Sequence, residues 1–91
     1  MKKRKLKYAR VFEFPPSVVV GGINVKIYGD MGCTVDHFDE ILVCREDLIR
    51  LDTELGILRI SGEDMMIREM DEVTIMITGC IHSVVYEKYE R

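Results

Sequence analysis

The chain has 91 residues, 47% hydrophobic and 32% charged, and its formal net charge at pH 7 is −3. This length holds one small domain and excludes a two-domain enzyme, and the composition is typical of a folded globular protein rather than a disordered chain. The charge is uneven, because residues 1–10 carry six of the 13 Lys and Arg residues and no acid, which leaves residues 11–91 with a net charge of −9.

The chain begins with a basic segment, residues 1–14, which we expect to be a flexible N-terminal arm. Its six cations are Lys2, Lys3, Arg4, Lys5, Lys7 and Arg10. Pro15 and Pro16 mark the boundary to a single small domain predicted for residues 15–91. Clustered Lys and Arg attract anionic lipid by about 1 kcal/mol each near a membrane surface, so the arm is predicted to attach the protein to a membrane or an acidic partner. Nucleic acid is disfavoured as a ligand, because the acidic body would repel phosphates.

The sequence also bears on location. Its longest uncharged stretch, residues 14–25, contains two prolines and two glycines and is much shorter than the ~20 apolar residues of a membrane helix. The basic start is not followed by the apolar run of a signal peptide. Cys33, Cys44 and Cys80 are an odd number of cysteines without paired spacing, typical of a reducing compartment. We therefore expect a cytoplasmic protein, peripheral at a membrane where the arm attaches it.

Apolar residues alternate with polar ones along most of the body, which is the period of half-buried strands. Taken in chain order, the residues predicted to share a face are Ile23, Val25 and Ile27; Ile49 and Leu51; Leu58 and Ile60; Val73, Ile75 and Ile77; and Ile81, Ser83 and Val85. Residues 38–50 also fit a helical spacing, but we favour a strand over residues 41–44. Residues 53–56, which end in a glycine, predict a hairpin turn between strands 48–52 and 57–61.

A short pattern, apolar-x-apolar-polar-Gly, occurs three times and ends at Gly29, Gly62 and Gly79. Each copy predicts a strand that stops at a glycine turn, and Gly56 is predicted to serve the hairpin turn. The sum is an all-β fold of about seven short strands, arranged as a mostly antiparallel meander, a small sandwich or a partly open barrel. A small irregular β-solenoid is the alternative. Exposed edge strands would permit homo-oligomers by strand pairing.

Two stretches carry a resemblance to a known family. They are IRLDTELGILRISGEDMMI at residues 49–67 and EVTIMITGCIHSVVY at residues 72–86, preceded by PPSV at residues 15–18. In the order of its strand and glycine units, the chain resembles the YabP/YqfC sporulation protein family from about residue 14 to residue 87, and its basic start favours the YqfC branch.

The resemblance implies a small non-enzymatic protein of spore-forming bacteria that acts in the mother cell. The YqfC branch is commonly paired with a larger membrane-bound sporulation protein, so a membrane-bound partner is implied as well. A self-assembling structural component of a spore layer, built by edge-strand pairing, is an alternative function.

A metal-binding protein is the second alternative. Its candidate ligands are Cys33 and His37, spaced Cys-x3-His, with Cys80 and His82, spaced Cys-x-His. Thiolate and imidazole are ligands of zinc, but no Cys-x2–4-Cys pair is present, so the sequence favours no metal and no cofactor. We expect Cys44 and Cys80 to fill the core and both histidines to lie at its margin. Four pairs of neighbouring acids, Glu63-Asp64 among them, are interpreted as solvated turn residues.

Overall fold

The computed structural model describes residues 6–12, 17–20, 23–28 and 31–89, and all regular structure in those residues is β-strand. The eight strands are β1 (Leu6–Phe12), β2 (Ser17–Val20), β3 (Ile23–Ile27), β4 (Gly32–Asp36), β5 (Glu40–Cys44), β6 (Leu48–Asp52), β7 (Gly56–Met70) and β8 (Thr74–Tyr89). The predicted all-β fold is confirmed, with eight strands in place of about seven. Two of them are not short, since β7 has 15 residues and β8 has 16.

The strands form one sheet in the order β2-β3-β4-β8-β7-β6-β5, and β1 also pairs with β8. Every pair is antiparallel, which differs from the parallel coils of the solenoid alternative. Strand β8 is central because it has β7 along one side and two partners on the other. Its first half, from Thr74 to Thr78, pairs with β4, and its second half, from Val84 to Tyr89, pairs with β1.

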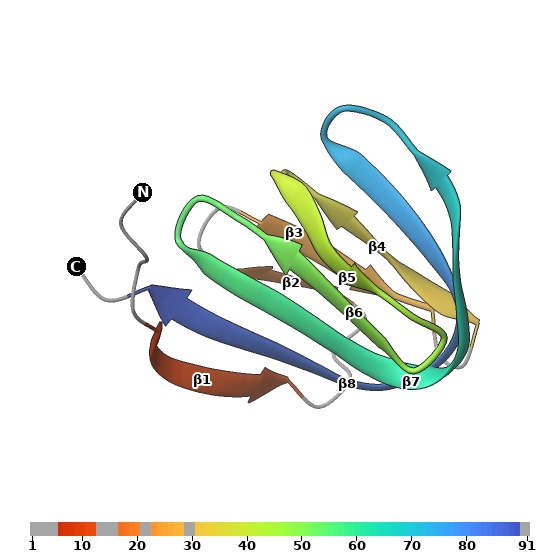
Figure 1. Ribbon diagram of the computed structural model, residues 1–91, viewed down its shortest axis with the longest axis horizontal. Helices are drawn as coiled ribbons and strands as arrows, with labels where there is room; N and C mark the ends of the chain where they lie inside the picture. Colours follow the sequence, from red (N-terminus) through yellow and green to blue (C-terminus); the bar gives the residue numbers. More distant parts are fainter. Residues whose placement is uncertain (1–5, 13–16, 21–22, 29–30, 90–91) are drawn as a thin grey trace.

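The long hairpin of β7 and β8 bends near its middle, so its two halves point in different directions in Figure 1. Strands β2, β3 and β4 then lie behind β5 and β6, and the single sheet encloses one core. That core draws on β3, β4, β6 and both long strands; its fully buried side chains include Ile23, Val25, Val35, Ile49, Leu51, Leu58, Ile60, Ile75, Ile77 and Val84. The alternation predicted for these strands is therefore confirmed for most of them, although Val73 is exposed.

The predicted hairpin turn is confirmed, and its residues show why it forms there. The Thr53 hydroxyl donates to the Gly56 carbonyl at 2.6 Å and accepts from the Gly56 N–H at 3.2 Å, while the Thr53 N–H donates to the same carbonyl at 2.9 Å. Thr53 is buried, so these hydrogen bonds satisfy polar groups that water does not reach. The strand predicted over residues 41–44 is also confirmed, as β5.

The prediction that strands stop at Gly62 and Gly79 is wrong, because both glycines lie inside the long strands. A Cβ on Gly62 would collide with the Cys80 carbonyl oxygen, and one on Gly79 would lie 2.7 Å from the Asp64 carbonyl oxygen. Gly79 also has φ +132°, a conformation that other residues rarely adopt. The two glycines thus let β7 and β8 approach closely at the bend without ending either strand. Gly29 lies outside the described residues.

The prediction that Ile81, Ser83 and Val85 share a face is wrong. Val84 and Tyr86 join Ile81 in the core cluster, whereas Val85 is buried outside that cluster. The register explains the change, since Ser61 pairs with Ser83 but the next residue, Gly62, pairs with Ile81. His82 is therefore an extra residue in β8, a β-bulge, and one extra residue reverses the alternation that follows it.

Part of the predicted flexible arm is paired backbone in the structure. Leu6–Phe12 forms β1 and pairs with β8 from Val84 to Tyr89. Residues 1–5 and 13–16 lie outside the described residues, so the division at residue 14 stays a prediction.

Candidate functional site

The basic residues predicted for membrane or partner attachment fall into two groups. Lys2, Lys3, Arg4 and Lys5 lie outside the described residues, whereas Lys7 and Arg10 belong to strand β1. The backbone of Arg10 pairs with that of Tyr86 in β8. A test of attachment must therefore separate residues 2–5 from the strand that follows them.

The four weak metal candidates do not come together as one site. Cys33 is buried in β4, where burial raises the pKa of its thiol from 9.0 to about 12. His37 is exposed just beyond β4, with a positive φ of 68°. Its backbone N–H donates to the Val73 carbonyl. A buried thiol that stays protonated is a poor ligand, because metals bind the thiolate. The Cys-x3-His spacing consequently marks a core cysteine followed by a turn residue.

Cys80 and His82, by contrast, meet an acid that the sequence interpretation assigned to a solvated turn and not to a ligand set. Glu63 and Cys80 are cross-strand partners in β7 and β8, and His82 Nε2 lies 3.4 Å from Glu63 Oε2. One ligand atom from each of the three side chains lies within 4.8 Å of the other two. Within the described ranges this is the one group of three or more Cys, His, Asp or Glu side chains close enough to share an ion. We call it the bend cluster.

The bend cluster owes its position to irregular backbone on both sides. The bulge at His82 lies on one side of the Glu63–Cys80 pair, and a second register shift, between Glu63 and Met66, lies on the other. That second shift includes Asp64 at φ 53°, opposite Gly79. Bulges of this kind often re-aim side chains next to functional sites. Here they gather three polar side chains on the outer surface while Ile81, between Cys80 and His82, enters the core.

The positions of two cysteines and one acidic pair differ from the sequence interpretation. Cys44 was expected in the core but is exposed, and Cys80 is only partly buried. Glu63 and Asp64 were interpreted as turn residues but lie within β7. The signal that could have found the cluster is the alternation that places Cys80 and His82 on one strand face. Their partner Glu63 depends on a cross-strand register that the sequence does not show.

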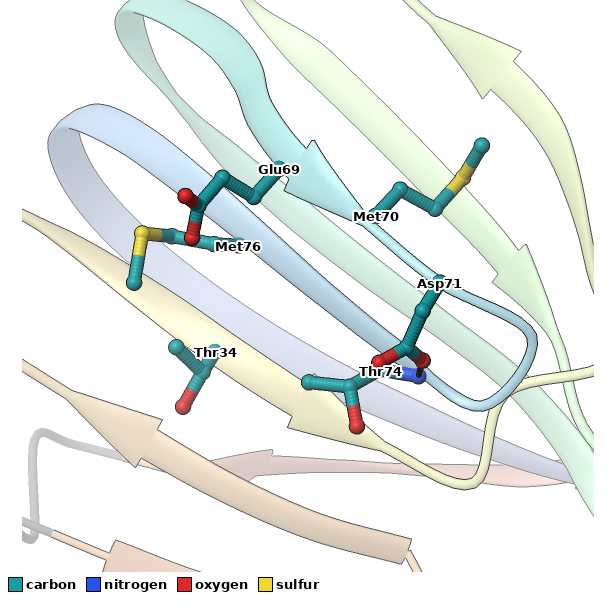
Figure 2. Close-up of a pocket in the computed structure, with 6 residues that line it drawn as sticks. All are labelled: Thr34, Glu69, Met70, Asp71, Thr74 and Met76. Atoms are coloured by element: carbon teal, nitrogen blue, oxygen red, sulfur yellow. Dashed lines mark hydrogen bonds between the residues drawn. The ribbon is translucent and has the colours of Figure 1, made fainter.

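A shallow depression lies on the outer surface of the second half of the hairpin, the part in which β7 from Met66 to Met70 pairs with β8 from Ile75 to Thr78. It is lined by Thr34, Glu69, Met70, Asp71, Thr74 and Met76, which Figure 2 shows as sticks. Met76 is the cross-strand partner of both Thr34 and Glu69, so the three form a row across β4, β8 and β7. Met70 points away from this row in Figure 2. The depression thus combines a thioether with a carboxylate on an exposed sheet face.

The turn at the end of this hairpin strengthens the acidic character of the depression. The Val73 and Thr74 N–H groups donate to Asp71 Oδ1 at 2.9 and 2.8 Å. These backbone hydrogen bonds hold the pKa of the Asp71 carboxyl below its ordinary value. Asp71 is therefore a carboxylate at neutral pH that lines the same depression as Glu69 (Figure 2), and a cationic group would be the complementary ligand here.

The outer side of β7 is an open edge from Met66 to Met70. Strand β6 pairs with β7 only as far as Ser61, and the part of the chain that the structure describes offers no strand partner beyond that point other than β8. Met66 and Met70 are each 56% exposed on this segment. A second depression, lined by Cys44, Arg45 and Glu46 with residues 64–67, adjoins its start. We call residues 66–70 the β7 edge.

The comparisons with known proteins give one match. The model of the YabP family matches residues 21–91, which include the β7 edge and the bend cluster. No curated protein and no solved structure matches the chain. In the described residues, no helix has the length and hydrophobicity that a membrane crossing requires.

Proposed function

The chain belongs to the YabP family and is therefore a sporulation-related protein, and we propose that it is a non-enzymatic interaction module that acts in the mother cell with a membrane-bound sporulation partner. The observation that carries this proposal is the β7 edge. An unpaired strand offers a row of backbone donors and acceptors to an incoming segment, and its side chains select that segment.

The side chains of the β7 edge suit a partner of definite chemistry. Met66 and Met70 are exposed, and methionine is common on binding surfaces because its flexible thioether adapts to the partner. Glu69, between them in the strand, and Asp71, just after it, add two carboxylates that line the shallow depression together with Met70. The proposed ligand is an extended segment of the partner that carries apolar residues and at least one Lys or Arg.

The edge is tested by photo-crosslinking from defined positions in sporulating cells. A photoreactive amino acid replaces Met66 or Met70, and in the control it replaces Arg59, an exposed residue in the first half of the same strand. The expected result is a crosslink to one membrane-spanning protein from the β7 edge and none from position 59. Equal crosslinking from position 59, or none from either, would contradict the proposal. A crosslink to a second copy would favour the self-assembling alternative instead.

The N-terminal cations are proposed to add electrostatic attachment to an anionic membrane. Removing residues 2–10 would also remove most of β1, so its result would mix attachment with folding. The sharper variant replaces Lys2, Lys3, Arg4 and Lys5 with Ser and keeps β1 intact. Because each cation near the surface contributes about 1 kcal/mol, we expect the variant to shift to the soluble fraction at low salt. If the variant and the unmodified chain fractionate alike at every salt concentration, the arm has no such role.

A further inference from the structure

The bend cluster has the donor chemistry of a transition-metal site. Cys80 offers a thiolate, His82 an imidazole nitrogen and Glu63 a carboxylate, and these are the three ligand types that zinc uses in proteins. The hard ions Mg²⁺ and Ca²⁺ prefer oxygen ligands alone, so a set with one sulfur and one nitrogen disfavours them. The donor set therefore indicates zinc or a neighbouring first-row metal.

The separation of the nitrogen and oxygen ligand atoms agrees with this indication. In tetrahedral zinc sites the Zn–N and Zn–O bonds are about 2.0–2.2 Å, which separates the two ligand atoms by roughly 3.4 Å. His82 Nε2 and Glu63 Oε2 lie 3.4 Å apart. A direct hydrogen bond between charged groups is shorter, about 2.7–2.9 Å. The separation thus fits two ligands of one ion better than a closed ion pair.

We propose that Glu63, Cys80 and His82 form a binding site for a divalent transition-metal ion, with Zn²⁺ as the preferred occupant. The side chains of Glu63 and His82 are 70% and 52% exposed, so an ion reaches the site directly from solvent. Three protein ligands leave a fourth position open to water or to a side chain of another molecule. This site is independent of the β7 edge, because it uses none of the side chains proposed there.

The backbone of the cluster restricts the ligands before an ion arrives. Glu63 and Cys80 face each other as a cross-strand pair, with the closely packed glycines Gly62 and Gly79 next to them in sequence. Less side-chain freedom is then lost on binding than in an unstructured Cys-x-His segment. The ordinary alternative is a surface His–Glu pair, whose contribution would be about 0–1 kcal/mol and would involve no thiol.

The test is a Co²⁺ titration of the purified, fully reduced chain. Cobalt replaces zinc in such sites and gives a thiolate-to-metal charge-transfer absorption that reports a Co–S bond. We expect this absorption to saturate at one equivalent and to disappear when Zn²⁺ is added. Cys80→Ser should abolish it, and Glu63→Gln and His82→Asn should each weaken binding at least about 10-fold.

Matched controls are available elsewhere in the chain. Cys44 is an exposed cysteine and His37 an exposed histidine, and neither belongs to the bend cluster. Cys44→Ser and His37→Asn should bind the metal as the unmodified chain does, and Asn tolerates the positive φ at position 37. Circular dichroism of every variant checks that the fold is retained. Absence of binding by the unmodified chain, binding retained in Cys80→Ser, or binding lost in Cys44→Ser would each overturn the proposal.

Discussion

The two halves of the β7–β8 hairpin have the same strands but different surroundings. In the first half, which precedes the bend in β7, β7 from Ile57 to Ser61 has β6 on one side, and β8 has β1 on the other. In the second half, β8 has β4 beside it, but the β7 edge has no further strand among the described residues. Burial follows this difference, since four of the six residues 56–61 are buried and only Met65 is buried in residues 64–70.

The comparison separates stability from binding within one strand. Residues flanked by strands on both sides contribute apolar surface to the core, and their replacement affects the free energy of unfolding. Residues at an open edge contribute little burial, so they can change without unfolding the protein. The proposed partner surface lies in the second half, and the proposed metal site lies at the bend where the halves meet.

The largest effect is expected from a cavity in the first half. Leu58 is 1% exposed, and Leu58→Ala should lower the free energy of unfolding by about 3 kcal/mol through lost burial and the remaining cavity. Ile67, a partly buried residue at the β7 edge, is the matched position in the second half. Ile67→Ala should cost roughly half as much or less. Equal losses in chemical denaturation would show that the two halves do not differ in this way.

The second-largest loss of stability is expected from a substitution at the bend between the halves. A methyl group at Gly62 collides with the Cys80 carbonyl, so Gly62→Ala must push β7 and β8 apart, at a cost of about 2 kcal/mol. Ser61→Ala, one residue earlier and partly exposed, is the local control and should change stability little. Urea denaturation measures both. A Gly62→Ala protein as stable as the unmodified chain would mean that close strand contact does not hold the bend.

The sequence predicts the first half of the hairpin better than the second. Alternation over residues 57–61 and the turn at residues 53–56 are local signals, and both are confirmed. The continuation of β7 and β8 through Gly62 and Gly79 is not local. It depends on which backbone lies opposite each glycine, so a glycine inside a bent strand resembles one in a turn. The strands were therefore expected to be short.

The same limit applies to the bend cluster. Two of its members, Cys80 and His82, were recognised as a pair from their spacing. The third, Glu63, joins them only through a cross-strand register that shifts on either side of the Glu63–Cys80 pair. A bulge adds one residue without a signature in the sequence, and it also reversed the expected faces of Val84 and Val85. The pairing of two distant segments, and not the residue types alone, brings these three side chains together.

The buried Cys33 thiol in β4, which pairs with β8 in the second half of the hairpin, gives a stability test at alkaline pH. Burial raises the pKa of Cys33 to about 12 from 9.0, so between these values the folded chain holds a proton that the unfolded chain releases. Below pH 9 ionisation of this thiol should leave the free energy of unfolding unchanged. As the pH rises from 9 toward 12, that free energy should fall by up to about 1.4 kcal/mol per pH unit. Cys33→Ala removes this thiol, and the difference between the two pH profiles isolates it. Parallel profiles would show that β4 is not tightly packed against the core.

The smallest effect is expected at the β7 edge, where two adjacent methionines face opposite sides of the sheet. Met66 is 56% exposed, so Met66→Gln should change the free energy of unfolding by no more than about 0.5 kcal/mol. Met65 is buried in the core cluster, and Met65→Gln places an amide there, which should cost about 2 kcal/mol. Thermal unfolding of both variants measures the contrast. A large loss from Met66→Gln would mean that the β7 edge is part of the stable core, and its role as a free binding edge would then fail with it.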